Sequence, residues 1–361
     1  MRLTRRLLNA ATHPVSHSTQ APPLVYNLGL SYAAKYSPPF VPASSDPESL
    51  GFAGKPTKLG KWVDAMRSLQ AGRGVLRARE GGWDEGLQEE VRKWGAGEDF
   101  FGVVDSGQWV NIAVSDGVGG WAPRYDPSLY AQALMYHYAS AVASSPSIAP
   151  WDALQKAYEK INADEAVKAG SATAVGVSLG ATGKSRAVNL GDSGFTILRN
   201  GQTVFESKSQ THYFNCPYQL SKVPKEMQNG AITDLPAHGQ RYEFDLQPGD
   251  VVILYTDGLS DNLPAAHVPA LDAAVLRVLD VEANAHLEHG ERAAEHARLL
   301  ADVLVASGRA AMARTGDEQG GHGQDWRTPF DIESEQHGRR YKGGKVDDIT
   351  VLTAVVSERL V

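Results

Sequence analysis

The sequence predicts an α+β fold built around antiparallel sheets. Short runs rich in Val, Ile and Leu are separated by the turn dipeptides Ser106-Gly107, Thr182-Gly183 and Asn200-Gly201, which are typical of β-hairpins. Apolar residues with helical periodicity appear on both sides of this strand-rich region. Because a parallel sheet would need a helix after nearly every strand, the hairpins favour antiparallel pairing.

The predicted strands follow one another closely after Trp94. A first hairpin ends directly at Asp116, and a Pro-Gly-Asp turn at 248–250 introduces a strand that leads to Asp257. The expected strands are residues 101–105, 109–115, 172–179, 186–190, 195–199, 202–205, 251–255 and 349–356.

Amphipathic helices flank these strands. Asp126 and Pro127 provide an N-cap and a first helical residue for a helix that continues to about residue 142. His137 lies on the apolar face of this helix, so we expect it to pack in the core rather than to bind a ligand. Further helices are expected at 152–163 and 291–311, and a polar loop at 315–345.

The N-terminus differs in composition from the rest of the chain. Residues 1–20 contain three arginines interleaved with leucines, and no acidic residue precedes Asp46, which is typical of a mitochondrial transit peptide. A basic tail without a targeting role is the alternative. We therefore expect a transit peptide and linker over 1–45, an extension over 46–93 and the main domain over 94–361. Deleting residues 1–45 is then expected to block import and to leave the main domain active.

Overall composition excludes several classes of protein. With 361 residues and 42% hydrophobic content, the chain can bury the core of one large domain, and it contains no run apolar enough to span a bilayer. A net charge of −7 argues against nucleic-acid binding. Cys216 is the only cysteine, so no disulfide forms within the chain, and no base stands beside it in the sequence to activate it. We expect a monomer.

Four short acidic clusters in the sequence indicate a possible functional site. They lie at 97–99, 115–120, 256–258 and 346–350, and most adjoin an apolar strand. Carboxylates at strand ends can be gathered in one place by a rigid sheet, although their mutual repulsion is costly unless a cation offsets it. Carboxylate oxygens are hard ligands, so the pattern predicts a site for Mg²⁺ or Mn²⁺.

The motifs resemble those of a known family in order and spacing. They are Glu98-Asp99, Ser-Asp-Gly-Val-Gly-Gly-Trp (115–121), Gly-Ser-Ala-Thr-Ala-Val (170–175), Asn-Leu-Gly-Asp-Ser-Gly (189–194), Thr-Asp-Gly-Leu-Ser-Asp-Asn (256–262) and Asp-Asp-Ile-Thr-Val (347–351). This set is similar to the metal-dependent protein phosphatases 2C. His-Tyr-Phe-Asn (212–215) and Pro-Tyr-Gln-Leu-Ser (217–221) resemble the mitochondrial, Ptc-seven-like branch in particular. The resemblance covers about residues 94–356.

The resemblance implies both a fold and a metal centre. The fold would be two central antiparallel sheets sandwiched between pairs of helices. Asp116 would bridge two ions, and Asp116, Asp257 and Asp347 would carry catalysis. The implied metal ligands are Glu98, Asp99, Asp116, Gly117 through its carbonyl, Asp257 and Asp347. Asp192 and Asp261 match positions for a weaker third cation, although turn and surface roles remain open for both.

The resemblance also implies an activity. Two Mn²⁺ or Mg²⁺ ions about 3.5 to 4 Å apart would activate a bridging water for direct attack on phosphoserine or phosphothreonine, without a phosphoenzyme. The substrates would be phosphoproteins of the mitochondrial matrix, including metabolic enzymes. A pseudophosphatase that only binds phosphoproteins and a hydrolase of small phosphate esters are the alternatives.

Two positions depart from the family pattern. Trp94 stands where an arginine usually binds phosphate. Either another cation binds the phosphate, with Arg92, Lys93 and Arg124 as candidates, or the metal ions alone bind it. Val118 replaces a histidine that often follows the Asp-Gly pair. A metal-bound water or another side chain would then protonate the leaving group. His212 is a candidate side chain, against the simpler interpretation that it packs within its loop.

Overall fold

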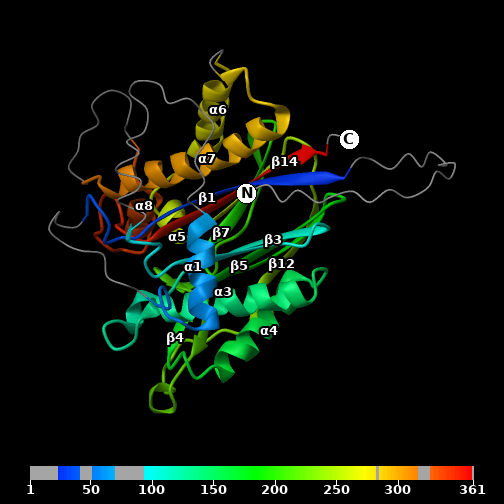
Figure 1. The fold of residues 1–361 in the computed structure, drawn as a ribbon. Helices are drawn as coiled ribbons and strands as arrows, with labels where there is room; N and C mark the ends of the chain where they lie inside the picture. The colour runs from blue at the N-terminus through cyan, green and yellow to red at the C-terminus, as the bar shows by residue number, and fades with distance from the viewer. Residues whose placement is uncertain (1–22, 41–50, 70–92, 282–283, 316–325, 360–361) are drawn as a thin grey trace, which may run out of the picture.

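The structure, a computed structural model, describes residues 23–40, 51–69, 93–281, 284–315 and 326–359. In these ranges two five-stranded antiparallel sheets pack face to face, and helices cover both outer faces (Figure 1). The prediction of two antiparallel sheets between helices is confirmed. None of the helices in the described part of the chain is long and apolar enough to cross a membrane.

The first sheet contains both the first and the last strand. Its order is β1 (Leu24–Ala33), β14 (Ile349–Glu358), β13 (Val251–Tyr255), β7 (Gly194–Arg199) and β8 (Gln202–Glu206). Val252 and Leu254 of β13 face the second sheet, whereas Val251 and Ile253 face the helices. Both faces of this strand are covered, which explains why it is apolar throughout.

The second sheet combines two hairpins with an edge strand from later in the chain. Its order is β12 (Gln240–Asp245), β6 (Lys184–Leu190), β5 (Ala174–Gly180), β3 (Trp109–Ser115) and β2 (Phe100–Asp105). The core between the sheets contains alternate side chains of both, among them Phe101, Ile112, Val177, Phe195 and Leu352. Asn200 and Gly201 both have positive φ, as expected for the tight turn between β7 and β8.

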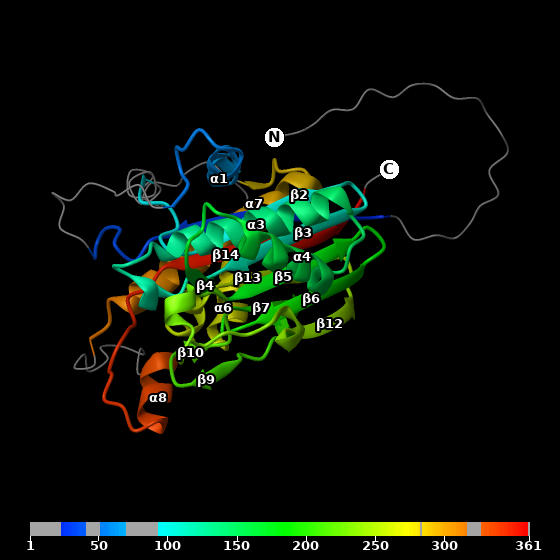
Figure 2. The same ribbon diagram turned by 90° about the horizontal axis from the view of Figure 1, so that it is seen from below.

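Helices close the sandwich on both sides. α3 (Pro127–Ser144) and α4 (Pro150–Ala163) cover the second sheet (Figure 2), while α6 (His267–Leu279) and α7 (His289–Met312) cover the first. Asp126 caps α3 as expected, because its carboxylate accepts a hydrogen bond from the Ser128 backbone at 3.0 Å. His137 Nε2 lies 3.1 Å from Asp164 Oδ2, consistent with the expected packing role.

The expected linker is wrong for its central part. β1 pairs with β14 along all ten residues, and α1 (Lys58–Ser68) lies where only an extension was expected. A Cβ on Gly29 would approach the Ala297 carbonyl oxygen to 2.1 Å, so α7 lies directly on this strand. The sheet therefore begins well before residue 94, and deleting residues 1–45 would remove one of its strands. The proposed transit peptide, residues 1–20, lies outside the described residues.

The region expected to be a polar loop contains a helix. α8 (Pro329–Gln336) begins at a Thr328 cap, whose hydroxyl accepts a hydrogen bond from the Asp331 backbone at 3.2 Å. α8 lies beside a small antiparallel pair, β9 (Thr211–Tyr213) with β10 (Cys216–Pro217), as Figure 2 shows. Phe214 at the tip of that pair packs on Phe330, with ring centroids 5.0 Å apart. The two segments together form one wall beside the end of the sandwich.

Candidate metal centre

Three aspartates from both sheets meet at one end of the sandwich. Asp116 follows β3, Asp192 lies in the turn between β6 and β7, and Asp257 follows β13 at the start of α5 (Asp257–Ser260). One carboxylate oxygen from each lies within 4.8 Å of those from the other two. The structure therefore brings together three of the residues that the sequence singled out.

The backbone around Asp116 is fixed on both sides. Its N–H donates to the Thr173 hydroxyl at 3.1 Å, and the Thr173 N–H donates to the Asp116 carbonyl at 2.9 Å. A Cβ on Gly117 would lie 2.6 Å from the Glu98 carbonyl oxygen and 2.8 Å from that of Pro127. Only glycine fits here without displacing backbone, so packing as well as chemistry accounts for the Asp-Gly pair.

Several buried carboxylate oxygens lack a partner. The Thr256 hydroxyl donates to Asp99 Oδ2 at 2.7 Å, but Asp99 Oδ1 has no hydrogen-bond partner among the described residues. The same holds for one oxygen each of Asp192 and Asp257. An unpaired buried charge is costly, and divalent cations are the natural partners of converging oxygens. The donor set therefore fits a hard divalent ion.

Two lysines that the sequence analysis did not consider lie among these acids. Lys345 Nζ contacts Asp257 and Asp261, each at 2.6 Å, and Asp347 at 3.0 Å. Lys35 Nζ contacts Glu98 at 2.6 Å. Lys345 stands two residues before Asp347, so the sequence alone could have indicated that it lies near the acids. Lys35 gave no such signal, because it falls within the expected linker.

Asp348 supports the loop that carries Glu98. Its two oxygens accept backbone hydrogen bonds from Lys35 at 2.7 Å and from Glu98 at 3.0 Å. Gly97 has φ +67°, and a Cβ there would fall 1.8 Å from Asp348 Oδ1. Asp348 therefore positions the Gly-Glu-Asp loop, whereas Asp347 contacts Lys345. The structure thus separates the two members of the Asp-Asp pair into different tasks.

The crowding of acids shifts their proton affinities. Burial raises the pKa of Asp116 and Asp192, and nearby Asp257 raises both further. Burial also raises the pKa of Asp99, and it raises that of Asp261 to about 7 despite the neighbouring Lys345. Burial acts in the same direction on Asp257 and is the largest single cause, but the combined effects of Lys345, Asp116 and Asp261 outweigh it and lower the pKa of that group. Asp257 is therefore the acid that most readily stays ionised.

Of the expected phosphate-binding cations, the two that the structure describes are exposed. Arg92 lies outside the described residues, Lys93 is exposed, and the exposed Arg124 guanidinium lies 5.5 Å from the centroid of the adjacent Tyr125 ring. Lys35 is instead the cation beside Glu98. A Cβ on Gly119, in the Asp-Gly-Val-Gly-Gly loop, would lie 3.8 Å from its ammonium.

His212 is held within its own loop. Its Nε2 lies 2.9 Å from Asp234 Oδ2, and its ring stacks on Tyr218 with centroids 4.3 Å apart. Both contacts use the ring for local packing and hydrogen bonding. The geometry therefore favours the packing interpretation over a general acid.

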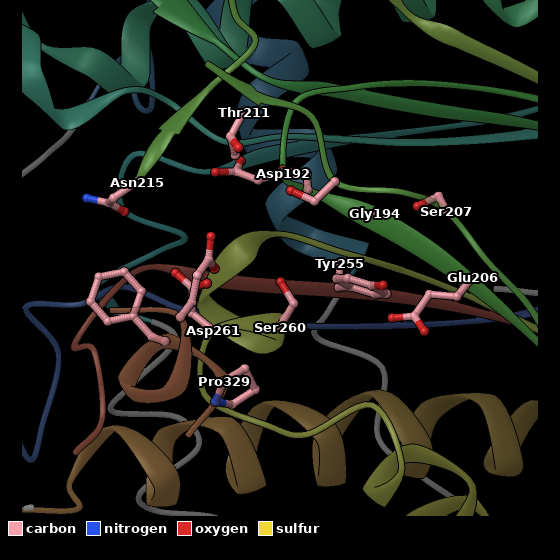
Figure 3. Close-up of a pocket in the computed structure, with 14 residues that line it drawn as sticks. Asp192, Gly194, Glu206, Ser207, Thr211, Asn215, Tyr255, Ser260, Asp261 and Pro329 are labelled. Atoms are coloured by element: carbon pink, nitrogen blue, oxygen red, sulfur yellow. The ribbon is translucent and has the colours of Figure 1, made fainter. Parts of the chain in front are cut away.

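A cavity of about 190 Å³ adjoins the aspartates. Figure 3 shows Asp192 on one side of it and Ser260 with Asp261 on the other. Thr211 and Asn215 of the β9–β10 segment also line it, as do Pro329, Phe330 and Glu333 of α8. Access to the carboxylates from this side is therefore shaped by the wall that α8 and the β9–β10 pair form.

Comparison with known proteins gives the family. The family model for protein phosphatase 2C matches residues 96–290. The 5-azacytidine resistance protein azr1 of Schizosaccharomyces pombe is 33% identical over 73% of this chain and 83% of its own length. The protein phosphatase PTC7 homolog of Xenopus laevis is 32% identical over 68% of this chain and 77% of its own. The mitochondrial protein phosphatase 2C homolog 7 of Saccharomyces cerevisiae is 31% identical over 75% of this chain and 77% of its own length.

A solved structure agrees with these relatives. The X-ray structure of the photosystem II phosphatase PBCP superimposes with a TM-score of 0.55 at 25% identity, covering 72% of this chain and 91% of that one. The chain belongs to the protein phosphatase 2C family, as the motifs predicted, and it is a protein-serine/threonine phosphatase. Within the family it belongs to the PTC7-like branch.

Proposed function

We propose that this phosphatase hydrolyses phosphoserine and phosphothreonine on mitochondrial proteins by direct attack of water at a centre of two Mn²⁺ or Mg²⁺ ions. The observation that carries the proposal is the convergence of Asp116, Asp192 and Asp257, with buried carboxylate oxygens left unpartnered. Membership of a metal-dependent family supports it.

Particular residues are proposed to hold the ions. Asp116, Asp257 and Asp347 would bind them directly, together with the Gly117 carbonyl, and Glu98 and Asp99 would act partly through water. When bound, the ions supply Lewis-acid chemistry that lowers the pKa of water and offsets phosphoryl charge. The chain needs no cysteine nucleophile for this reaction, and Cys216 is buried in β10.

Other residues would position the substrate. Lys35 carries a positive charge beside Glu98 and close to the Gly119 backbone, so we propose that it meets the substrate phosphate in place of the arginine that Trp94 replaces. Arg309 supports the segment after β1, because its guanidinium donates to the Ala34 and Ser37 carbonyls, each at 3.2 Å. The phosphate would then be held by a lysine that the first strand places at the centre.

The proposed location is the mitochondrial matrix. The arginine-rich composition of residues 1–20 and the mitochondrial description of the yeast relative both support it. Metabolic enzymes of that compartment are the proposed substrates.

Phosphate release from a phosphothreonine peptide by the full chain tests the reaction. We expect release with Mn²⁺ or Mg²⁺ and none with EDTA, because the buried carboxylates need the ions to act on phosphate. Unchanged release in EDTA would overturn the metal mechanism. Release from small phosphate esters but from no phosphopeptide would overturn the proposed substrate class.

Acid should weaken the stabilisation that Mn²⁺ gives. The pKa values of Asp116 and Asp192 are raised and that of Asp261 is about 7, so the metal-free protein gains stability as pH falls below these values toward the unfolded value near 4. Mn²⁺ requires the ionised form, so it should raise the Tm more at about pH 8 than at about pH 6. Differential scanning fluorimetry with Mn²⁺ and with EDTA measures the difference. An equal rise at both pH values would contradict the prediction.

A further inference from the structure

The Lys345 ammonium lies where a divalent cation would be expected. It contacts Asp257 and Asp261 at 2.6 Å and Asp347 at 3.0 Å, and its side chain is only 15% exposed. Asp261 is one of the two residues that family resemblance offers for a third cation. Its Oδ2 atom is directly paired with the lysine, so a divalent ion at that oxygen would have to displace the ammonium or approach it closely.

The lysine is held in place by its backbone. Its N–H donates to Asn262 Oδ1 at 2.9 Å, and Asn262 Nδ2 donates back to the Lys345 carbonyl at 2.9 Å. Asn262 is fully buried and also donates to the Gly258 carbonyl at 3.0 Å. The segment that follows Asp257 and the segment that precedes Asp347 are therefore joined through one asparagine, with the lysine between them.

The neighbours of Lys345 leave it little freedom. A Cβ on Gly344 would lie 2.1 Å from the Ala311 carbonyl oxygen, so the chain approaches the end of α7 closely at this point. The ammonium lies 5.1 Å from the centroid of the Phe330 ring on α8. Lys345 is therefore held in the site by its backbone hydrogen bonds, by the close approach of Gly344 to α7 and by the Phe330 ring.

Only one of the two carboxylate oxygens of Asp257 has a hydrogen-bond partner among the described residues. Its Oδ2 atom pairs with Lys345, while its Oδ1 atom is buried and has no hydrogen-bond partner among the described residues. Oδ1 therefore remains for a metal ion. The lysine pairs with only one of the two Asp257 oxygens, and Asp116 and Asp192 each bring a carboxylate oxygen to within 4.8 Å of an Asp257 oxygen.

We propose that the Lys345 ammonium takes the place of a third cation, so that the complete centre consists of two divalent ions and one fixed lysine. Asp261 is then a partner of the lysine and not a metal ligand. The inference rests on the proposed two-metal function. The lysine offsets the negative charge of Asp261 and Asp347, so no weakly bound ion is needed there.

Counting bound metal tests this inference without measuring turnover. Full-length wild type and Lys345→Met are dialysed to equilibrium against excess Mn²⁺, and metal per folded chain is determined by mass spectrometry. We expect two ions in the wild type and an additional, weaker ion in Lys345→Met, because removing the ammonium frees Asp261. Lys342→Met removes an exposed lysine from the same segment and should bind two ions.

A second variant keeps the test decisive if Lys345→Met does not fold. Asp261→Asn should still bind two ions, since the aspartate serves the lysine. Three ions in the wild type, with one lost in Asp261→Asn, would overturn the inference and leave the phosphatase proposal standing. An unchanged count in folded Lys345→Met would also overturn it. A wild type that binds no Mn²⁺ would overturn the metal centre itself and the inference with it.

Discussion

Asp116→Asn should abolish phosphatase activity while leaving the fold intact. The substitution keeps the shape of the side chain, and the backbone hydrogen bonds with Thr173 do not involve the carboxylate. It removes one charge from the three aspartates that converge at the centre. We expect kcat/KM to fall at least about a hundredfold, the lower end of the cost of losing one group that stabilises charge in a transition state.

The same substitution, Asp116→Asn, should not lower the thermal stability of the metal-free protein. Burial and the nearby Asp257 and Asp99 raise the pKa of Asp116, so a neutral residue relieves repulsion in the metal-free protein. Its Tm in EDTA should equal or exceed that of the wild type, and the increase caused by Mn²⁺ should shrink. Asp152→Asn, an equivalent change at an exposed position of α4, should alter neither property. Wild-type turnover by Asp116→Asn would contradict the assignment of the centre.

Deleting residues 1–45 should prevent folding, contrary to the expectation from sequence. The deletion removes β1, which pairs with β14 along its whole length and lies under α7. Each lost backbone hydrogen bond costs about 1 kcal/mol net, and the stability of a whole domain is only about 5–15 kcal/mol. We expect an insoluble protein, or one without a cooperative unfolding transition in circular dichroism.

A shorter deletion is the matched control. Removing residues 1–20 leaves β1 and Lys35 in place, so the protein should keep its Tm and its phosphate release. In cells the same protein should remain in the cytosol while the full chain enters mitochondria. A soluble, active protein after deletion of residues 1–45 would show that β1 is dispensable. Import of the protein without residues 1–20 would contradict the proposed transit peptide.

Most strands were predictable because local chemistry defines them. Turn dipeptides such as Asn200-Gly201 mark the hairpins, and β13 is short, apolar and bounded by turn residues. β1 carries a weaker signal. Its residues include Gly29, which α7 requires, and prolines stand on both sides of it, so composition suggested a linker. Its place in the sheet depends on pairing with a strand more than 300 residues away, which no local pattern records.

In the site, too, residues in local motifs were predictable, whereas residues whose roles depend on distant contacts were not. Asp116 and Asp257 were predictable because each follows an apolar strand, whereas Asp192 was indicated only by the family resemblance, and the fold brings the three together. The role of Lys35 could not be predicted from the sequence, because it depends on contacts with Glu98 and Asp348, which belong to distant segments. Lys345 stands next to the Asp347 motif, but its role depends on contacts with Asp257 and Asp261 from a distant segment.

The position of β14 between β1 and β13 also constrains when the enzyme becomes active during its synthesis. Lys345, Asp347 and Asp348 are translated after every other residue of the centre, and β14 directly follows them. Until the ribosome has released this segment, β1 and β13 have no partner between them and Asp257 lacks its lysine. We therefore expect a partly made chain to lack the complete proposed centre and to become active only after the last strand has been inserted.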